Sequence, residues 1–464
     1  MMVRIFNVYF PVRALLVCLG ETILVALSFL VVTRVYLGPD AELFLAYEGG
    51  AAKILLVTVV FIVCIYYLDL YDTLVLTNRR EILVRLLAAI GIGTVIFALL
   101  YTAYPGAQID LHQFVGGICL MLVLIGIWRE LVVRGLSSHH LVERALLLGE
   151  GPLAIDLAEQ FVKRPEIGIR LMGYVSDYPG RMNGLPLEYL GRCDRLISAV
   201  KKSGASRLVV AVEERRGSLP VEGLLSLKTD HSVRVQDGVD VYETLTGKLP
   251  VQSLRLSWLL FSPGFRVSRS LLFHKRLLSV IVSGFLLVLF SPIMLLIALI
   301  IRLDSPGPVI FRQPRVGQHG KIFLLYKFRS MFHGSEAHGN HPPLDGGDGR
   351  LTRVGRILRR TRLDELPQLC NILRGDMHFV GPRPFVPEQE QELVQKVPLY
   401  AQRWVVKPGI TGWAQVKRGY CVTVEDNEEK LAYDLFYIKN MSVRLDLLII
   451  FVTVKILLLG RGGR

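Results

Sequence analysis

Two adjacent carboxylates stand among arginines in the carboxyl-terminal third of the chain. Asp364 and Glu365 follow the run Arg359-Arg360-Thr361-Arg362 and precede Pro367. Because proline is tolerated in the first turn of a helix, we predict a helix that begins at about Asp364, with Asp364 as its cap. The positive end of such a helix and the arginines would keep a carboxylate ionised and attract a diphosphate. A capped helix with surface ion pairs is the alternative interpretation.

A pair of cations precedes this segment in the chain. Polar and apolar residues alternate in residues 321–331, so that Lys327 and Arg329 fall on one face of a predicted strand. Two cations on one face suit the binding of a phosphate group. A solvated strand face is the alternative.

A divalent cation fits the predicted chemistry. A carboxylate and a diphosphate repel each other, and Mg²⁺, which prefers oxygen ligands, reduces that repulsion. We therefore expect Asp364 and Glu365 to bind Mg²⁺. His333, His338 and His341 could also bind a metal, but they lie in a segment rich in Gly, Pro and Asp, which we interpret as a loop.

Two further segments combine glycine and proline with polar side chains. Residues 381–384 form the sequence Gly-Pro-Arg-Pro, which predicts a rigid turn that presents Arg383 next to Pro384. Residues 406–416 also contain proline and glycine, which predict a rigid loop, and we expect Trp413 to be exposed there. Rigid loops of this kind usually position functional groups.

A long apolar segment lies directly before the predicted strands. Residues 277–301 carry no charge, which is enough length for a helix that crosses a membrane. However, Ser291 and Pro292 lie in the middle, where proline removes a helical hydrogen bond. A crossing would also export the basic residues 350–374, against the positive-inside tendency. We therefore favour a re-entrant helix that breaks at Ser291-Pro292 over a kinked transmembrane span.

Four other apolar segments approach the length of a membrane span. They are residues 14–32, 51–68, 82–101 and 114–133. The first connection, residues 38–50, and the third, residues 102–113, contain no Lys or Arg, whereas Arg79 and Arg80 follow the second span and Arg134 follows the fourth. This distribution predicts a cytoplasmic amino terminus and a cytoplasmic exit. Glu21 within the first span could be functional, but pairing within the bundle is the more usual role.

The overall composition agrees with a membrane protein. The 464 residues are 52% hydrophobic and carry a net charge of +14. The basic residues cluster near apolar segments, which favours anionic lipid and phosphate as partners. Nothing resembles a zinc finger or an RNA-binding motif, so we expect no nucleic-acid partner. The six cysteines have no close pair and suit a reducing compartment.

Short apolar strands alternate with helical segments in the middle of the chain. Strands are predicted at residues 145–148, 171–175 and 207–212, with helices between them. This order predicts a parallel sheet and an α/β domain. Gly149-Glu150-Gly151-Pro152-Leu153-Ala154 has the G-x-G-x-x-A pattern of a dinucleotide-binding turn. Glu150 argues against a bound pyrophosphate, and a tight turn in a degenerate Rossmann-like domain is the simpler interpretation.

The carboxyl-terminal segments together resemble a known family, the bacterial sugar transferases, also called monotopic phosphoglycosyl transferases. The resemblance covers about residues 270–464. It is carried, in order, by the apolar helix with its Ser-Pro break and by SPGPVIFRQPRVG, YKFRSM, LDELPQLCNILRGDM, FVGPRP and KPGITGWAQV. The preceding spans and α/β domain resemble the long form of the family, in its exopolysaccharide-initiating branch. One departure is Ser279, where the family usually has an aspartate.

The resemblance implies a fold of three parts. These are a four-helix transmembrane region at 1–138, a Rossmann-like domain at 139–265, and a catalytic α/β domain at 266–464 with a re-entrant helix at about 275–302. It also implies a location in the bacterial inner membrane, with the catalytic domain on the cytoplasmic face. Long-form relatives suggest a homodimer.

The resemblance implies a two-step transfer as well. Asp364 would attack the sugar-bearing phosphate of a UDP-sugar and release UMP, and undecaprenyl phosphate would then take the phosphosugar. Glu365 would assist through Mg²⁺, while Lys327, Arg359 and Arg383 would contact phosphate. A glycosyltransferase that releases UDP and a non-catalytic scaffold or sensor are the alternatives.

Overall fold

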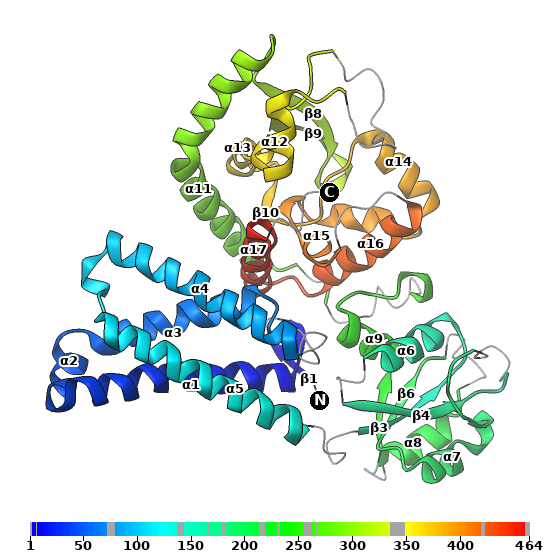
Figure 1. Cartoon of the computed structure of the whole chain (residues 1–464). Coiled ribbons are helices and arrows are strands. Elements are labelled where there is room, and N and C mark those ends of the chain that lie inside the picture. Colours follow the sequence, from blue (N-terminus) through cyan, green and yellow to red (C-terminus); the bar gives the residue numbers. More distant parts are fainter. Residues whose placement is uncertain are drawn as a thin grey trace.

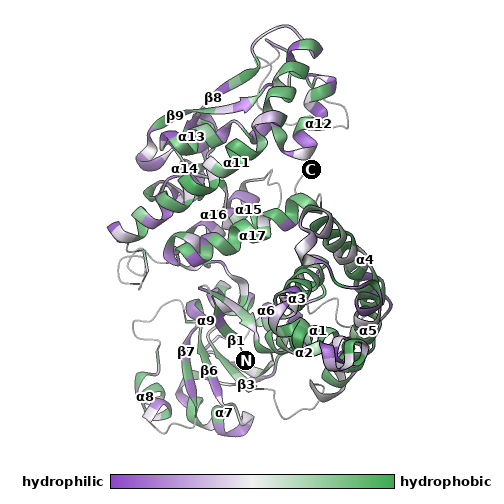
Figure 2. Ribbon diagram, turned by 90° about the vertical axis from the view of Figure 1, so that its left-hand side faces the viewer, coloured by the Kyte–Doolittle hydropathy of each residue, from purple (hydrophilic) through white to green (hydrophobic). Residues whose placement is uncertain are grey.

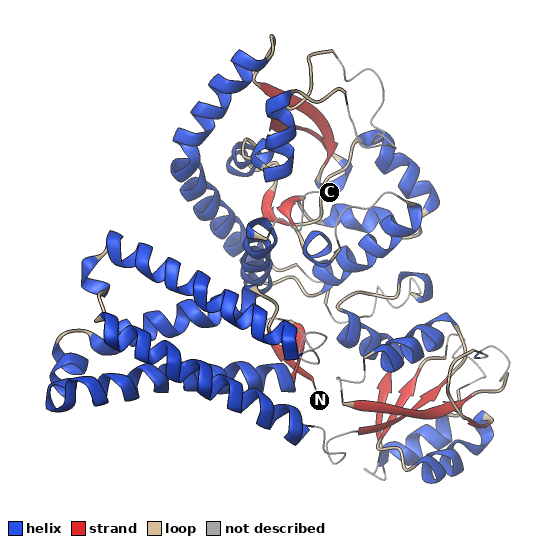
Figure 3. Ribbon diagram, viewed as in Figure 1, coloured by secondary structure: helices blue, strands red, loops and turns tan. Residues whose placement is uncertain are grey.

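The computed structural model of the chain has three groups of elements (Figures 1 and 3). It describes residues 2–5, 7–71, 79–136, 143–164, 168–178, 182, 184–212, 219–229, 233–254, 262, 264–265, 267–334, 349–418 and 423–459. Long helices form the first group, a parallel sheet with helices forms the second, and the carboxyl-terminal part of the chain forms the third.

Four long apolar helices follow a short amino-terminal hairpin of β1 (Met2–Ile5) and β2 (Val8–Pro11). They are α1 (Val12–Leu37), α3 (Gly50–Tyr67), α4 (Arg79–Ala103) and α5 (Leu111–Leu136), with a short α2 (Ala41–Tyr47) between the first two. All four are long and apolar enough to cross a membrane, in agreement with the sequence prediction. They lie side by side, and the colours of Figure 2 show that most of their residues are hydrophobic.

An ion pair between α1 and α5 accounts for the charge in the first apolar segment. The Arg129 side chain donates a hydrogen bond of 2.6 Å to Glu21, and both residues are buried. A buried charge in an apolar bundle is costly unless it is paired. Of the two roles considered for Glu21, the structure supports pairing within the bundle.

The middle of the chain forms the predicted α/β domain. Its five parallel strands lie in the order β5-β4-β3-β6-β7. In chain order they are β3 (Glu143–Leu148), β4 (Ile169–Val175), β5 (Tyr189–Gly191), β6 (Arg207–Val210) and β7 (Arg234–Asp237). The helices are α6 (Pro152–Lys163), α7 (Leu196–Ser203), α8 (Val221–Thr229) and α9 (Gly238–Thr246). Apolar side chains on both faces of the sheet form two cores, as a parallel sheet requires.

The glycine turn after β3 is closely packed. Gly149 has a φ of +127°, and a Cβ atom there would lie 2.5 Å from the carbonyl oxygen of Ala211. The Glu150 carboxylate accepts a 2.9 Å hydrogen bond from the backbone N–H of Tyr178. This acid therefore has a local structural contact, which agrees with the interpretation of a tight turn.

The third group begins with α11 (Arg269–Asp304), a helix of 36 residues. The strands β8 (Ile310–Val316) and β9 (Ile322–Phe328) then form an antiparallel hairpin, as the alternation of residues 321–331 predicts. A parallel pair joins β10 (His378–Val380) to β11 (Gly409–Thr411). The remaining helices are α12 (Arg353–Thr361), α13 (Gln368–Arg374), α14 (Pro387–Lys396), α15 (Trp413–Lys417), α16 (Val424–Lys439) and α17 (Val443–Leu458).

The sequence predicts a helix break at Ser291-Pro292, and this prediction is wrong. The helix is continuous, with Pro292 inside it, and Figure 1 shows it as one curved ribbon. The Ser291 hydroxyl donates a hydrogen bond of 2.8 Å to the Val288 carbonyl oxygen one turn earlier. A proline can be accommodated in a helix with a bend, because only the local hydrogen bond is lost.

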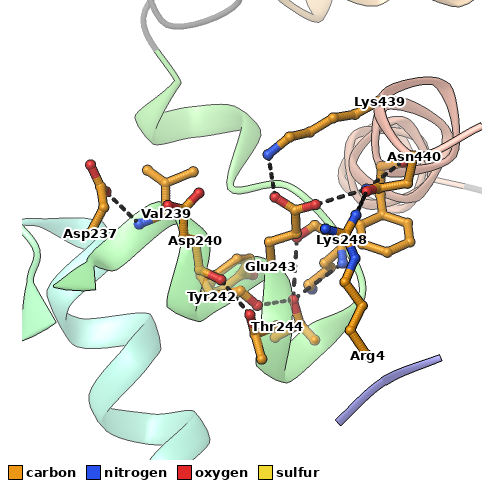
Figure 4. A network of polar contacts seen from close by, with 12 residues as sticks. Arg4, Asp237, Val239, Asp240, Tyr242, Glu243, Thr244, Lys248, Lys439 and Asn440 are labelled. Atoms are coloured by element: carbon orange, nitrogen blue, oxygen red, sulfur yellow. Dashed lines mark hydrogen bonds and ion pairs between the residues drawn. The ribbon is translucent and has the colours of Figure 1, made fainter. Parts of the chain in front are cut away.

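The α/β domain is joined by buried contacts to the third group of elements, which begins with α11 and is called the catalytic part below. Leu249 and Val251 pack in the main core of the catalytic part, together with Val8 of the amino-terminal hairpin. Figure 4 shows Glu243 of α9, which pairs with Lys439 and accepts a 2.8 Å hydrogen bond from Asn440 at the end of α16. Residues 249–254, which the sequence assigns to the α/β domain, thus contribute to the catalytic core.

Candidate active site

The two carboxylates lie in a short turn between two helices. A 3₁₀ turn, η11 (Leu363–Glu365), follows α12, and α13 begins only at Gln368. The predicted helix start at Asp364 is therefore wrong, and Asp364 does not cap the helix. Arg362 ends α12 with a φ of +61°, a conformation that is unfavourable for a residue with a side chain. The dyad therefore lies in the turn between α12 and α13.

Glu365 is held by two arginines. Arg383 lies 2.9 Å from its Oε1 atom, and Arg362 lies 3.2 Å from the same oxygen. Burial by itself would raise the pKa of Glu365, but the positive charges of Arg383, Lys327 and Arg362 outweigh it and lower the pKa to about 2. Glu365 is therefore an anion at neutral pH, and its main contacts are with protein cations.

Asp364 has a different environment. It is only 6% exposed, and its Oδ1 atom has no hydrogen-bond partner among the residues that the structure describes. Burial, and next the negative charge of Glu365, raise its pKa, although Lys327 and Arg359 act in the opposite direction. A buried carboxylate oxygen without a partner is costly unless a ligand completes the site. Asp364 is thus the carboxylate of the dyad that is poised to react with or bind a ligand.

Lys327 reaches the dyad from the end of β9. Burial lowers its pKa to about 8, while the charges of Glu365 and Asp364 partly restore it. Asn371 of α13 fixes the strand, because its side chain accepts a hydrogen bond from the Tyr326 N–H at 2.9 Å and donates to the Leu324 carbonyl at 2.7 Å. The sequence analysis did not single out Asn371, although its buried amide ties the strand that carries Lys327 to the helix after the dyad.

Arg329 does not join Lys327 at the dyad. Its guanidinium donates to the carbonyl oxygen of Ser305 at 2.6 Å, to the Ser305 hydroxyl at 2.8 Å, and to the Pro306 carbonyl at 3.1 Å. These groups lie at the end of α11, where unpaired carbonyls and the helix dipole favour a cation. The strand ends at Phe328, so the period-two pattern does not extend to Arg329. The structure gives Arg329 a structural role at the end of α11.

Arg359 lies in the last turn of α12 and lines the same cavity as the dyad. Its Nε atom donates a 3.0 Å hydrogen bond to the Ser330 hydroxyl, which orients the guanidinium. Pro384 also lines the cavity, and its carbonyl oxygen accepts a hydrogen bond of 3.2 Å from Arg315. Both residues therefore line the cavity that contains the dyad, and their contact with a substrate stays a prediction.

Two glycine-containing loops bring Arg383 to Glu365. The Gly381 N–H donates to the Thr411 carbonyl at 2.9 Å, and the Gly409 N–H donates to the Pro382 carbonyl at 3.0 Å. A Cβ atom at Gly409 would lie only 2.1 Å from the Gly381 nitrogen, so this approach requires glycine. The loop that contains Gly409 thus supports the loop that contains Gly381, and the Gly381 loop presents Arg383.

A buried arginine also supports this loop. Arg403 donates a 2.9 Å hydrogen bond to the Arg383 carbonyl oxygen, and it pairs with Asp434 at 2.9 Å and Glu390 at 3.4 Å. Its side chain is 3% exposed, and the two carboxylates balance its charge. The sequence analysis missed this residue, because its partners come from three different segments.

Trp413 is buried, so the expectation of an exposed side chain is wrong. It is 2% exposed, stacks on Phe436, and donates a 2.8 Å hydrogen bond to the Gly247 carbonyl oxygen after α9. The indole thus joins the catalytic part to the α/β domain. The family motif around Trp413 supports the fold at this position.

The dyad opens into a cavity of about 2090 Å³. Its lining contains the cations Arg312, Arg315, Lys327, Arg350, Arg356, Arg359, Arg360, Arg362, Arg383, Lys417, Arg418, Lys430 and Lys455. Apolar residues of α11 and α17 also line it. A cavity lined by both cations and apolar residues suits substrates that combine phosphate groups with a lipid chain.

The dyad supplies two adjacent carboxylates for a cation at this site. No group of three or more His, Cys, Asp or Glu side chains gathers as a metal cage within the described ranges, and His338 and His341 lie outside those ranges. Mg²⁺ is commonly bound by one or two carboxylates, with waters and substrate phosphates as its other ligands. The unpaired Oδ1 atom of Asp364 fits that mode of binding.

The comparisons with known proteins agree with this geometry. Residues 270–460 match the model of the family described as bacterial sugar transferase. A UDP-glucose:undecaprenyl-phosphate glucose-1-phosphate transferase of Klebsiella pneumoniae is 37% identical over 67% of this chain and 67% of its own length. The protein of the same name from Escherichia coli is 35% identical over 69% of each chain. The chain therefore belongs to the bacterial sugar transferase family.

A relative with a different printed sugar matches the chain over a shorter range. A UDP-N-acetylgalactosamine-undecaprenyl-phosphate N-acetylgalactosaminephosphotransferase of Aeromonas hydrophila is 44% identical over 48% of this chain. The match spans about half of that relative, 52% of its length. This relative is more identical to the chain over its matched range than the two relatives named for glucose are over theirs. Sequence identity alone therefore does not assign the sugar.

Proposed function

We propose that this protein transfers a hexose-1-phosphate from a UDP-sugar to undecaprenyl phosphate and releases UMP, as the first membrane step of exopolysaccharide or O-antigen assembly. The observation that carries the proposal is Asp364, a buried carboxylate with an unpaired oxygen in a cavity lined by cations and by apolar residues. The names of the relatives that match about two thirds of the chain support the two substrates.

The proposed reaction has two displacements at phosphorus. An Asp364 oxygen attacks the sugar-bearing phosphate, and the bond to the UMP leaving group breaks. An oxygen of the polyprenyl phosphate then attacks the same phosphorus, which gives the polyprenyl-diphosphate-sugar and restores the Asp364 carboxylate. Lys327, Arg359 and Arg383 stabilise the negative charge that develops on the phosphate oxygens.

We propose Mg²⁺ as the cofactor of this site. Asp364 would hold it through the unpaired oxygen, and Glu365 would act through its water shell, because Arg383 and Arg362 already contact Glu365. The ion would neutralise part of the diphosphate charge when it is bound.

We also propose that α11 is re-entrant. Near its start, Arg276 donates a 2.7 Å hydrogen bond to the Leu373 carbonyl, and at its end Ser305 accepts from Arg329. Both anchors belong to the catalytic part. Between them, Phe285, Val288 and Leu295 are 64%, 73% and 73% exposed. These contacts and exposures support a helix that bends at Pro292 and enters and leaves the bilayer on the same face.

The remaining architecture follows the long form of the family. We propose that α1, α3, α4 and α5 are a four-helix transmembrane bundle in the bacterial inner membrane, with the catalytic domain on the cytoplasmic face. The β5-β4-β3-β6-β7 order supports a Rossmann-like assignment for the α/β domain. The resemblance supports a homodimer, which cross-linking in membranes can test.

The decisive assay uses purified protein with UDP-sugars, polyprenyl phosphate and Mg²⁺. We expect UMP as the nucleotide product, and UDP would instead indicate a glycosyltransferase. Asp364→Asn should lower turnover by about 10³-fold or more, because an amide is a poor nucleophile. Asp194→Asn is the control, because Asp194 is exposed in the α/β domain and lies outside the cavity lining. Full turnover by Asp364→Asn would exclude the covalent mechanism.

A further inference from the structure

Part of the cavity lining is apolar, and we call it the apolar arm. Val282, Phe285, Leu286 and Phe290 of α11 belong to it, together with apolar residues of α17, including Leu457. Phe285 is 64% exposed and Leu457 is 51% exposed, although both belong to the cavity that contains Asp364. The cationic reaction site therefore continues into a surface that favours a hydrocarbon ligand.

The end of a membrane helix completes this arm. Tyr66 of α3 and Asp69, which directly follows that helix, line the same cavity, although they precede the dyad by almost 300 residues in the sequence. They form a wall that the carboxyl-terminal part of the chain does not supply by itself.

Specific contacts hold this wall in place. Lys455 of α17 pairs with Asp69 and donates a 3.0 Å hydrogen bond to the Tyr66 carbonyl oxygen. The Tyr66 ring lies 5.3 Å from the Phe451 ring, and Arg85 of α4 lies 3.8 Å from Asp69. A partly buried ion pair combined with ring packing gives this junction a defined geometry.

We propose that the apolar arm binds the isoprenoid chain of the acceptor, and that Tyr66 of the membrane bundle forms part of that binding surface. This inference rests on the proposed function. A phosphate monoester can reach the cations near the dyad while its single chain follows the arm between α11 and α17. A phospholipid differs in carrying a phosphate diester and two chains.

The test compares two neighbouring tyrosines in the full chain. Tyr66 and Tyr67 both contact Phe451, with ring centroids at 5.3 and 5.2 Å, but only Tyr66 lines the cavity. Tyr66→Ala should raise the KM for an acceptor of eleven isoprene units by about 5- to 20-fold, given the apolar area removed. The KM for an acceptor of three units and the KM for the UDP-sugar should change by less than about twofold. Tyr67→Ala should leave all three values near those of the unmodified protein.

The outcomes separate this inference from the proposed function. If the unmodified protein releases no UMP, the proposed function fails. If it is active but Tyr66→Ala affects the long acceptor no more than Tyr67→Ala does, only the inference is overturned. A photo-reactive benzoylphenylalanine in place of Tyr66 gives a second measurement that is independent of turnover. Cross-linking to radiolabelled long-chain polyprenyl phosphate is expected, and cross-linking to bulk phospholipid alone would overturn the inference.

Discussion

The two residues of the dyad are chemically unequal. Glu365 is held by Arg383 and Arg362, whereas Asp364 has a buried oxygen with no partner among the described residues. Neighbouring carboxylates with different surroundings can take different roles, one as a fixed anion and one as a reactive group. This asymmetry favours Asp364 as the nucleophile, in agreement with the role that the family resemblance implies.

Removal of Arg383 should move the acid limb of the pH profile to higher pH. The pKa of Glu365 is about 2, because Arg383, Lys327 and Arg362 outweigh burial. Without Arg383, burial has more influence, so the pKa should rise and Glu365 should gain a proton at a higher pH than in the unmodified protein. The measurement is kcat/KM of Arg383→Ala between pH 4 and 7. Arg383→Lys is the control, and it should show a smaller shift because it keeps the charge.

Lys327 should determine an alkaline limit of activity. Its pKa is lowered to about 8, mainly by burial, so the free enzyme loses this positive charge as the pH rises through 8. We expect kcat/KM for the UDP-sugar to fall above that pH, because the neutral amine cannot neutralise phosphate. Lys327→Arg, which stays charged, should remove this alkaline fall even if its maximal rate is lower. An unchanged alkaline limb in this variant would contradict the assignment.

At the scale of elements, the end of α11 depends on Arg329. Its guanidinium contacts the Ser305 and Pro306 carbonyl groups and is 3% exposed. Arg329→Met should lower the free energy of unfolding by about 2–4 kcal/mol, because buried carbonyl groups lose a charged donor. Thermal unfolding in detergent measures this loss. The KM for the UDP-sugar of the folded fraction should stay within about twofold, whereas a phosphate-binding role would raise it strongly.

The topology of α11 can be tested through the exposed thiol of Cys370 in α13. In a variant with Cys370 as its only cysteine, a re-entrant α11 places this thiol on the cytoplasmic face. A membrane-impermeant maleimide should therefore label inside-out vesicles and leave right-side-out vesicles unlabelled. Labelling of right-side-out vesicles alone would show that α11 crosses the membrane. The same variant with Pro292→Ala shows whether the proline is needed for the orientation.

At the scale of the whole molecule, Glu243 links three parts of the chain. Lys439 and Asn440 contact it directly, and Arg4 of the amino-terminal hairpin donates a 2.8 Å hydrogen bond to Asn440 (Figure 4). Glu243 is 6% exposed. Its position makes it a link between the α/β domain and the end of α16.

Glu243→Ala should loosen this junction. Loss of one partner leaves the Lys439 charge and the Asn440 amide without their buried acceptor, which usually costs about 3–5 kcal/mol. Amide hydrogen exchange should therefore increase in α9 and at the end of α16, with little change in the centre of the α/β sheet. Glu188→Ala is the control, because Glu188 forms an exposed pair with Lys202 on the same domain. Equal exchange in both variants would contradict the role of Glu243.

The sequence by itself determined the elements with strong local signals. Apolar length predicted the long helices, and the alternation of strands with helices predicted the parallel sheet, because burial imposes these periods on the residues themselves. The order of several family motifs predicted the cationic surroundings of Asp364 and Glu365. Lys327 and Arg383 could be named in advance because each lies within a motif, and Arg359 because it belongs to the run of arginines just before the dyad.

Only the tertiary structure decided which partners these residues have. Arg329 reaches the end of α11, Trp413 is buried against Gly247, and Arg403 supports the Arg383 loop through carboxylates of α14 and α16. Tyr66 joins the reaction cavity from a helix at the other end of the chain. The physical reason is that burial and hydrogen bonding depend on contacts between segments distant in sequence, which no local period records.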